Sequence, residues 1–146
     1  MLHNEDIETS FGLTKRVKFQ TESKAIQFIK NLEHLKTDSF GSISIPDFGY
    51  ERSGTTVTQF VEFIKGRPEG MLVKKYRDKI YEDIVCKQGE YTFCDFNYEN
   101  FLVKKDRIYA IDFQSYGQYP MTDRYWAWSA DNIQNKKVLD YMTREL

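Results

Sequence analysis

The stretch FCDFNYENFLVKKDRIYAIDFQ, residues 93–114, sets three polar side chains among apolar ones. Its apolar runs FLV and IYAIDF flank the tetrapeptide KKDR, and this pattern predicts a tight hairpin centred near Lys105. A hairpin returns the chain to the place where it started. We therefore expect Asn100 and Asp112 to lie close together at its base, with Asp95 on the loop that precedes it.

The three side chains suit the chemistry of a divalent cation and a phosphate. Mg²⁺ takes oxygen ligands, commonly one or two carboxylates together with substrate phosphates. The amide of Asn100 and the carboxylate of Asp112 supply such oxygens. A second carboxylate within reach, Asp95, can orient a substrate hydroxyl and accept its proton. The competing interpretation is turn and cap chemistry, which also favours Asp and Asn.

The composition of the 146-residue chain excludes several function classes. With 21 Lys and Arg against 22 Asp and Glu, the net charge of −1 argues against a dedicated nucleic-acid binder. No apolar run reaches the length of a membrane span, and the first ten residues lack the pattern of a signal peptide. Two Cys and two His are too few for a disulfide framework, a Cys-rich zinc site or a well-supplied catalytic triad. The expectation is a cytoplasmic domain with no nucleic-acid or membrane partner.

Outward from the central stretch, the chain predicts an α+β fold. In the first part of the chain, the periodicities predict a strand over 13–19, a helix over 22–35 with Thr21 as its cap, a short strand near 43–45, and two strands around a turn at Ser53 and Gly54. In the second part they predict a helix over 71–87, the hairpin, and a final helix in the aromatic tail. Three chain breakers, Gly66, Pro68 and Gly70, separate a sheet-rich first part from a helical second part.

The central motif resembles that of the protein-kinase-like superfamily, most closely the aminoglycoside phosphotransferase and choline kinase family. That signature has an Asp, four residues, an Asn, and a later Asp that follows an apolar strand. Asp95, Asn100 and Asp112 fall on it in register. The resemblance implies a minimal two-lobed kinase-like fold, with a small sheet-rich N-lobe at 1–66 that binds nucleotide and a reduced helical C-lobe at 67–146.

The resemblance also implies a reaction and a role for each site residue. The reaction is transfer of a phosphoryl group from ATP to a hydroxyl of a small molecule, with Mg²⁺ or Mn²⁺ as cofactor. The implied roles are Asp95 as catalytic residue, Asn100 and Asp112 as metal ligands, Lys18 on the nucleotide phosphates, Glu22 as the partner that orients Lys18, and the backbone of Glu62, Phe63 and Ile64 on adenine. Lys15 and Glu33 are the alternative to Lys18 and Glu22.

Several alternatives stay open at this point. Phe93 stands where the family has a His, which favours a catalytically weak, kinase-like binding module. The short acceptor region favours a kinase of a protein or another macromolecule, and a homodimer in which a neighbour completes the site is a further alternative. The aromatic group Tyr116, Tyr119, Tyr125, Trp126 and Trp128 is either core or a cage for a quaternary ammonium group.

Overall fold

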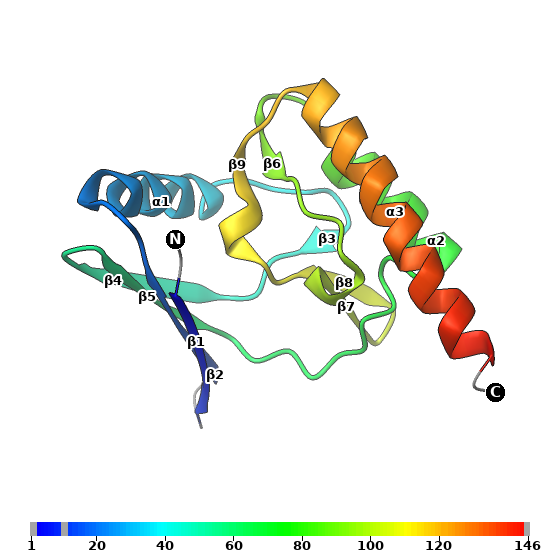
Figure 1. The fold of residues 1–146 in the computed structure, drawn as a ribbon, viewed down its shortest axis with the longest axis horizontal. Coiled ribbons are helices and arrows are strands. Elements are labelled where there is room, and N and C mark those ends of the chain that lie inside the picture. Colours follow the sequence, from blue (N-terminus) through cyan, green and yellow to red (C-terminus); the bar gives the residue numbers. More distant parts are fainter. Residues whose placement is uncertain (1–2, 10–11, 145–146) are drawn as a thin grey trace. The chain divides into compact units, whose positions relative to one another are not determined.

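The computed structural model describes residues 3–9 and 12–144, and this part of the chain has an α+β fold with small, mainly antiparallel sheets and three helices (Figure 1). It divides into two compact units, Met1–Ser39 with Pro46–Ile64, and Phe40–Ile45 with Lys65–Leu146. None of the helices described is both long and apolar enough to cross a membrane. The predicted α+β class is confirmed.

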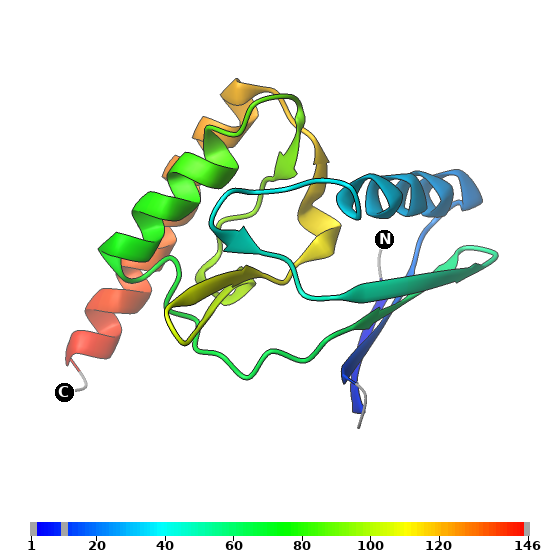
Figure 2. The same ribbon diagram turned by 180° about the vertical axis from the view of Figure 1, so that it is seen from behind.

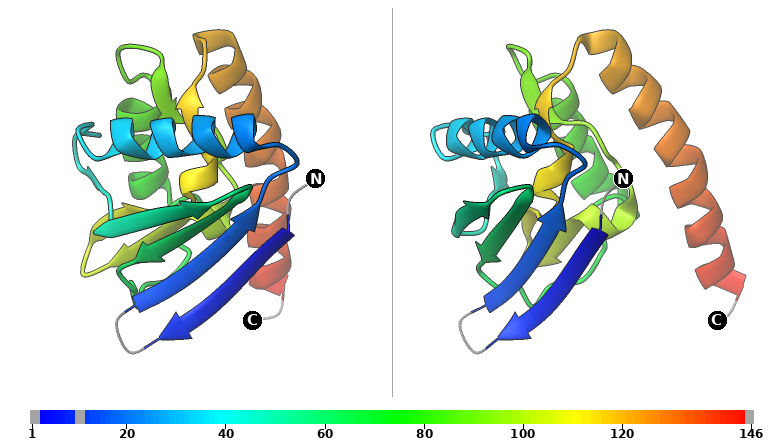
Figure 3. Two further views of the ribbon diagram at one scale, coloured as in Figure 1. Left: turned by 90° about the vertical axis from the view of Figure 1, so that its left-hand side faces the viewer. Right: turned by 60° about the vertical axis from the view of Figure 1, so that its left-hand side comes forward.

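The first unit is a four-stranded antiparallel sheet with one helix lying over it (Figure 3). The strand order is β1-β2-β5-β4. The elements are β1 (His3–Thr9), β2 (Gly12–Lys18), α1 (Glu22–Leu35), β4 (Phe48–Ser53) and β5 (Thr56–Val61).

Helix α1 forms where its sequence pattern predicts it. Thr21 is the N-cap, and its hydroxyl accepts a hydrogen bond from the backbone N–H of Lys24 at 3.2 Å. Four residues at helical spacing are buried: Ala25, Phe28, Leu32 and Leu35. On the sheet side, Val17 and Val57 are fully buried. Burial of each large apolar side chain contributes about 1.5–3 kcal/mol, so this stripe holds the helix on the sheet.

The predicted pair of strands around Ser53 and Gly54 is confirmed as β4 and β5, and Gly54 has the left-handed φ of +60° that the turn requires. Strand β1 was not predicted. Its sequence, HNEDIET, holds one apolar residue and shows no alternation. It is a strand because its backbone pairs with the edge of β2, from His3 opposite Lys18 to Thr9 opposite Gly12.

The second unit is built from two small sheets and two helices (Figure 2). Its strands are β3 (Ile43–Ser44), β6 (Tyr91–Phe93), β7 (Phe101–Lys104), β8 (Arg107–Ala110) and β9 (Tyr116–Gln118). Its helices are α2 (Lys74–Ile80) and α3 (Met121–Arg144). One sheet has the order β3-β8-β7, and the other is the pair β6-β9.

The predicted hairpin is confirmed as β7 and β8. Lys105 and Asp106 form its two-residue turn with φ values of 51° and 63°, the left-handed conformation that suits the twist of a hairpin. The carboxylate of Asp106 accepts hydrogen bonds from Lys75 Nζ at 3.1 Å and from the Tyr76 hydroxyl. These bonds attach the turn to α2.

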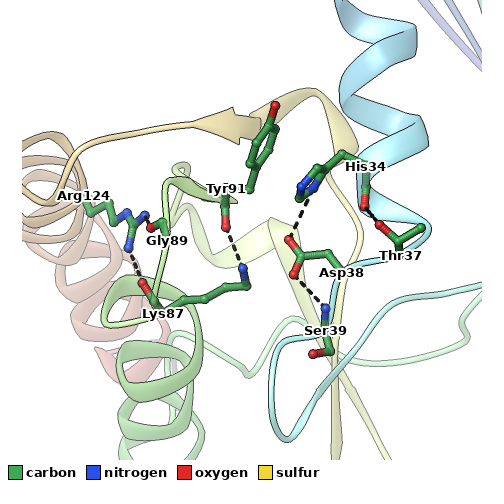
Figure 4. A network of polar contacts seen from close by, with 8 residues as sticks. All are labelled: His34, Thr37, Asp38, Ser39, Lys87, Gly89, Tyr91 and Arg124. Atoms are coloured by element: carbon green, nitrogen blue, oxygen red, sulfur yellow. Dashed lines mark hydrogen bonds and ion pairs between the residues drawn. The ribbon is translucent and has the colours of Figure 1, made fainter.

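The second helix differs from the prediction of a helix over 71–87. Residues 71–73 form a turn, α2 begins at Lys74, and a π-helical turn (Tyr81–Val85) ends the helical segment. A buried side chain of α3 lies at the far end of this segment. Arg124 is 1% exposed and donates to the carbonyl oxygens of Val85, Lys87 and Gly89, so these carbonyl groups bond to a guanidinium where the helical segment ends. Figure 4 shows the bonds to Lys87 and Gly89.

Residues 40–45 were predicted to belong to the first lobe, but they group with the second unit. Strand β3 pairs in parallel with β8, with Ile43 opposite Ile108. The carboxylate of Asp83 accepts hydrogen bonds from the backbone N–H and the hydroxyl of Ser42, at 2.8 and 2.7 Å. The units change again between Ile64 and Lys65, close to the predicted division after Gly66.

Candidate catalytic site

Two antiparallel pairings in the second unit draw the three predicted site residues toward one another. At the base of the β7–β8 hairpin, the backbone N–H of Ile111 donates to the carbonyl of Asn100 at 3.1 Å, which sets Asn100 beside the residue before Asp112. Beyond the β6–β9 pair, the N–H of Cys94 donates to the carbonyl of Ser115 at 3.1 Å. Asp95 therefore comes directly after Cys94, which is hydrogen-bonded to Ser115, and Ser115 lies three positions after Asp112.

Helix α3 holds the loop that carries Asp95. The carboxylate of Asp131 accepts the backbone N–H of Phe96 at 2.8 Å. The amide of Asn135 donates to the carbonyl of Phe96 at 2.7 Å and accepts the N–H of Tyr98 at 3.0 Å. Asn135 is 3% exposed. Backbone hydrogen bonds to a rigid helix fix a loop more tightly than apolar contact does, because they are directional.

Replacement of Asn135 by Leu should destabilise the protein by about 2–4 kcal/mol, because it leaves two buried backbone groups of the loop without partners. Urea denaturation measures this loss, and faster hydrogen exchange of the Tyr98 amide locates it. Asn132→Leu is the matched control, because the Asn132 amide donates only to the carbonyl of Trp128 within its own helix, at 2.7 Å. An equal loss in both variants would contradict the role assigned to Asn135.

Asn100 and Asp112 offer the oxygen ligands that a hard cation prefers. Asp112 caps a short 3₁₀ turn (Phe113–Ser115), and its Oδ1 accepts the N–H of Gln114 at 3.2 Å. The side-chain amide of Asn100 makes no hydrogen bond within the described part of the chain. No three His, Cys, Asp or Glu side chains are grouped to hold a metal within residues 3–9 and 12–144. A cation here would take one carboxylate, one amide and further oxygens from phosphate and water, which fits Mg²⁺.

A negative field surrounds the site. Burial raises the pKa of the Tyr119 hydroxyl, and the charges of Cys94, Asp112 and Asp95 raise it further. Burial also raises the pKa of Asp131, to which the charge of Asp95 adds. These couplings locate Tyr119 and Asp131 near the predicted acids, and such a field favours the approach of a cation.

Cys94, next to Asp95, is affected chiefly by its own burial and then by the charges around it. Burial and then the charge of Asp123 raise the pKa of its thiol from 9.0 to about 11. Only the thiolate reacts with alkylating agents, so at pH 8 the reactive fraction falls by about 100-fold. We expect iodoacetamide to modify Cys94 at least about tenfold more slowly than the exposed Cys86, measured by mass spectrometry at pH 8. Equal rates would show that the loop opens or that the acids lie elsewhere.

Phe93 stands where the resemblance expects a His. Its side chain is 1% exposed, and its ring lies 5.1 Å from that of Phe40 and 5.3 Å from that of Tyr116. Aromatic pairs at such distances contribute about 0.5–1.5 kcal/mol beyond the area they bury. Phe93 therefore supports the loop through packing.

The first unit does not pair Lys18 with Glu22. Lys18 is the last residue of β2 and follows the buried Val17, so its side chain points to the face of the sheet away from α1. Glu22 instead forms an ion pair with Arg52, Oε1 to Nη1 at 3.0 Å. The pairing that the resemblance implied between Lys18 and Glu22 is not the one formed.

Lys15 of the alternative pair lies on the helix-facing side of the sheet. Lys15 is opposite Gln59, which is opposite Tyr50, so the three side chains share the face that α1 covers. Burial raises the pKa of Tyr50, and the negative charge of Glu33 on α1 raises it further, which locates Glu33 close by. Lys15 thus lies on the helix-facing side of the sheet, and Glu33 is an exposed residue of α1 close to Tyr50.

The predicted hinge segment has mixed roles. Glu62 is tied to Asp47 by two hydrogen bonds, from its own N–H to the Asp47 carbonyl at 2.8 Å and from the Asp47 N–H to its Oε1 at 3.1 Å. Phe63 is exposed and Ile64 is buried. Neither Phe63 nor Ile64 forms a hydrogen bond within the described residues.

The aromatic tail does not form a single cage in the described structure. Tyr116 packs in a cluster with Phe40, Tyr91 and Phe93. Trp128 contacts Phe96 and Tyr81, whereas Trp126 is 75% exposed. The rings of Tyr116 and Trp128 therefore pack against different residues of the unit. This geometry favours the interpretation of both as core residues.

The residues that the sequence did not single out are Asp131, Asn135 and Tyr119. Asp131 and Asn135 are four positions apart on a helix, which places both on one face. A polar pair at this spacing, on the helix face that also carries Trp128, was the sequence pattern that could have identified these two residues. Tyr119 was considered only as an aromatic ring, and its nearness to the acids depends on the β6–β9 pairing.

No protein-family model matches this chain, and no curated protein sequence matches it either.

Proposed function

We propose that this protein is an ATP- and Mg²⁺-dependent phosphotransferase that phosphorylates a hydroxyl group of a small molecule. The observation that carries the proposal is the convergence of Asp95, Asn100 and Asp112 through two separate backbone pairings. Turn chemistry alone would not require the segments that carry these three residues to be paired with one another. The spacing that resembles the aminoglycoside phosphotransferase and choline kinase family supports the same conclusion.

In this proposal each residue has a defined task. Asp95 orients the acceptor hydroxyl and takes its proton as the phosphoryl group transfers. Asn100 and Asp112 hold the cation, which neutralises charge on the phosphates when it is bound. Asp131 and Asn135 are positioning residues, because they hold the loop of Asp95 through Phe96 and Tyr98.

The finer fold belongs to the proposal as well. We infer a minimal two-lobed kinase-like arrangement in which the first unit binds the nucleotide. Lys15 with Glu33 is favoured over Lys18 with Glu22, because Lys15 lies on the face of the sheet that α1 covers, Glu33 of α1 lies close to Tyr50 on that face, and Glu22 is engaged by Arg52. The backbone of Phe63 and Ile64 is the adenine contact, since it forms no hydrogen bond within the described residues.

The test is formation of ADP from ATP by the purified protein, with and without Mg²⁺, across a panel of small hydroxyl compounds. Acceptor-dependent ADP release that needs the metal supports the proposal. Absence of both nucleotide binding and turnover would remove it. Substitution of GTP for ATP in the same assay identifies the donor.

A kinase-like binding module without catalysis is the second candidate. The observation that favours it is Phe93, a fully packed apolar side chain at the position where the resemblance expects a His. This candidate predicts a thermal shift with nucleotide but no turnover, and no change in that shift for Asp95→Asn. A shift that needs Mg²⁺ and disappears in Asp112→Ala, together with turnover, would exclude it.

A further inference from the structure

A pocket in the second unit is lined in part by α3, the helix that holds the Asp95 loop, and none of the three site acids lines it. The residues 71–77 and the second half of α3 line a hollow of about 320 Å³. Its walls include Met71, Leu72 and Leu139 on the apolar side and Asn132 on the polar side. This volume is at the lower end of the range for small-molecule sites, so the occupant is small.

The charges in this pocket are of one sign. Arg77 and Lys136 line it, and the lining contains no acid among the described residues. Two nearby acids are matched elsewhere, since Asp78 pairs with Lys74 at 2.7 Å and Asp106 with Lys75 at 3.1 Å, and Asp140, four positions after Lys136 on α3, does not line the pocket.

Neither of the two cations has a carboxylate partner within residues 3–9 and 12–144. Arg77 makes one long hydrogen bond, from Nη1 to the carbonyl of Met71 at 3.4 Å. A guanidinium presents a planar fork of donors that matches a carboxylate or a phosphate. The guanidinium of Arg77 and the ammonium of Lys136 beside an apolar wall define the chemistry of the ligand.

We propose that this pocket binds a small anionic amphiphile, a molecule with one carboxylate or phosphate headgroup and a short apolar chain. The headgroup lies between Arg77 and Lys136, and the chain lies against Met71, Leu72 and Leu139. The side-chain amide of Asn132 offers a further polar contact to the headgroup.

The site is connected to the catalytic loop through one residue. Asn135 lines the pocket, and its amide also bonds the carbonyl of Phe96 and the N–H of Tyr98. A ligand that displaces or orders Asn135 changes the support of the Asp95 loop, so the pocket is an effector site. This coupling to activity rests on the proposed function, whereas the binding itself does not.

The test is a titration of the ¹⁵N-labelled full chain with octanoate and with octyl phosphate, followed by NMR. We expect saturable shifts of the Asn132 and Asn135 side-chain amides and of the Phe96 and Tyr98 backbone amides. The headgroup that binds more tightly identifies the anion. In the double variant Arg77→Gln, Lys136→Gln, we expect the affinity for the anion to fall at least about tenfold. Lys137→Gln is the matched control, because Lys137 is exposed on the same helix and does not line the pocket.

Three outcomes would overturn the proposal. Octanol moving the same signals with equal affinity would show that the anion is not recognised. Unchanged affinity in the double variant would place the ligand elsewhere, and no saturable shift at all would remove the site. Binding without any change at Phe96 and Tyr98 would overturn the coupling. Nucleotide takes no part in this titration, so a failure of phosphoryl transfer leaves its result intact.

Discussion

Asp95→Asn is expected to lower phosphoryl transfer by about 10²–10⁴-fold while the protein stays folded, because an amide cannot accept the proton of the acceptor hydroxyl. The substitution preserves shape, and the Asn97 N–H that now donates to Asp95 Oδ1 at 3.1 Å can donate to the new amide oxygen. The measurement is the turnover number under saturating ATP and acceptor, alongside the midpoint of thermal unfolding.

Asp112, the proposed metal ligand, gives a second arm to this experiment. Asp112→Ala removes the one carboxylate offered to the cation, so both turnover and the Mg²⁺-dependent thermal shift with ATP should be lost. Asp95→Asn should keep that shift. Glu99→Gln is the matched control, because Glu99 is an exposed acid of the same loop, next to Asn100. A variant at Asp95 with full turnover, or a loss in Glu99→Gln as large as in Asp95→Asn, would contradict the assignment.

Arg124→Met is expected to destabilise the protein by about 3–5 kcal/mol, the largest effect on stability that we foresee. Besides the carbonyls of Val85, Lys87 and Gly89, the guanidinium donates to the carbonyl of Tyr119 at 3.0 Å. Methionine fills a similar volume but donates to none of them. Buried carbonyls at the end of the π-helical turn would then lack partners, each at a cost of about 1–3 kcal/mol, partly relieved by water.

Chemical denaturation of Arg124→Met and of the surface control Lys137→Met measures the difference. The control should change the free energy of unfolding by less than about 0.5 kcal/mol, as exposed substitutions usually do. Arg124→Lys should recover little, because a single ammonium cannot reach the four carbonyls that the planar guanidinium serves. A small loss in Arg124→Met would show that water satisfies these groups equally well.

Local pattern was sufficient for the elements whose residues carry their own signal. Helix α1 was predicted with its bounds and its cap, because its apolar stripe and Thr21 act within a few residues. The β7–β8 hairpin was predicted because two apolar runs flank a polar turn. Strands β6 and β9 were not predicted, since each has three residues and exists through pairing with the other.

The same contrast applies to the candidate site. The sequence by itself predicted the hairpin and the three candidate side chains around it, because five- and twelve-residue gaps around a hairpin are local information. Tertiary structure alone decided what surrounds them. Asp131 and Asn135 reach the loop across 35 to 39 positions of chain, and Arg124 reaches the end of the π-helical turn across a similar distance. Glu22 bonds Arg52 in place of Lys18. Such contacts depend on how distant segments pack, and no short-range pattern of residues encodes them.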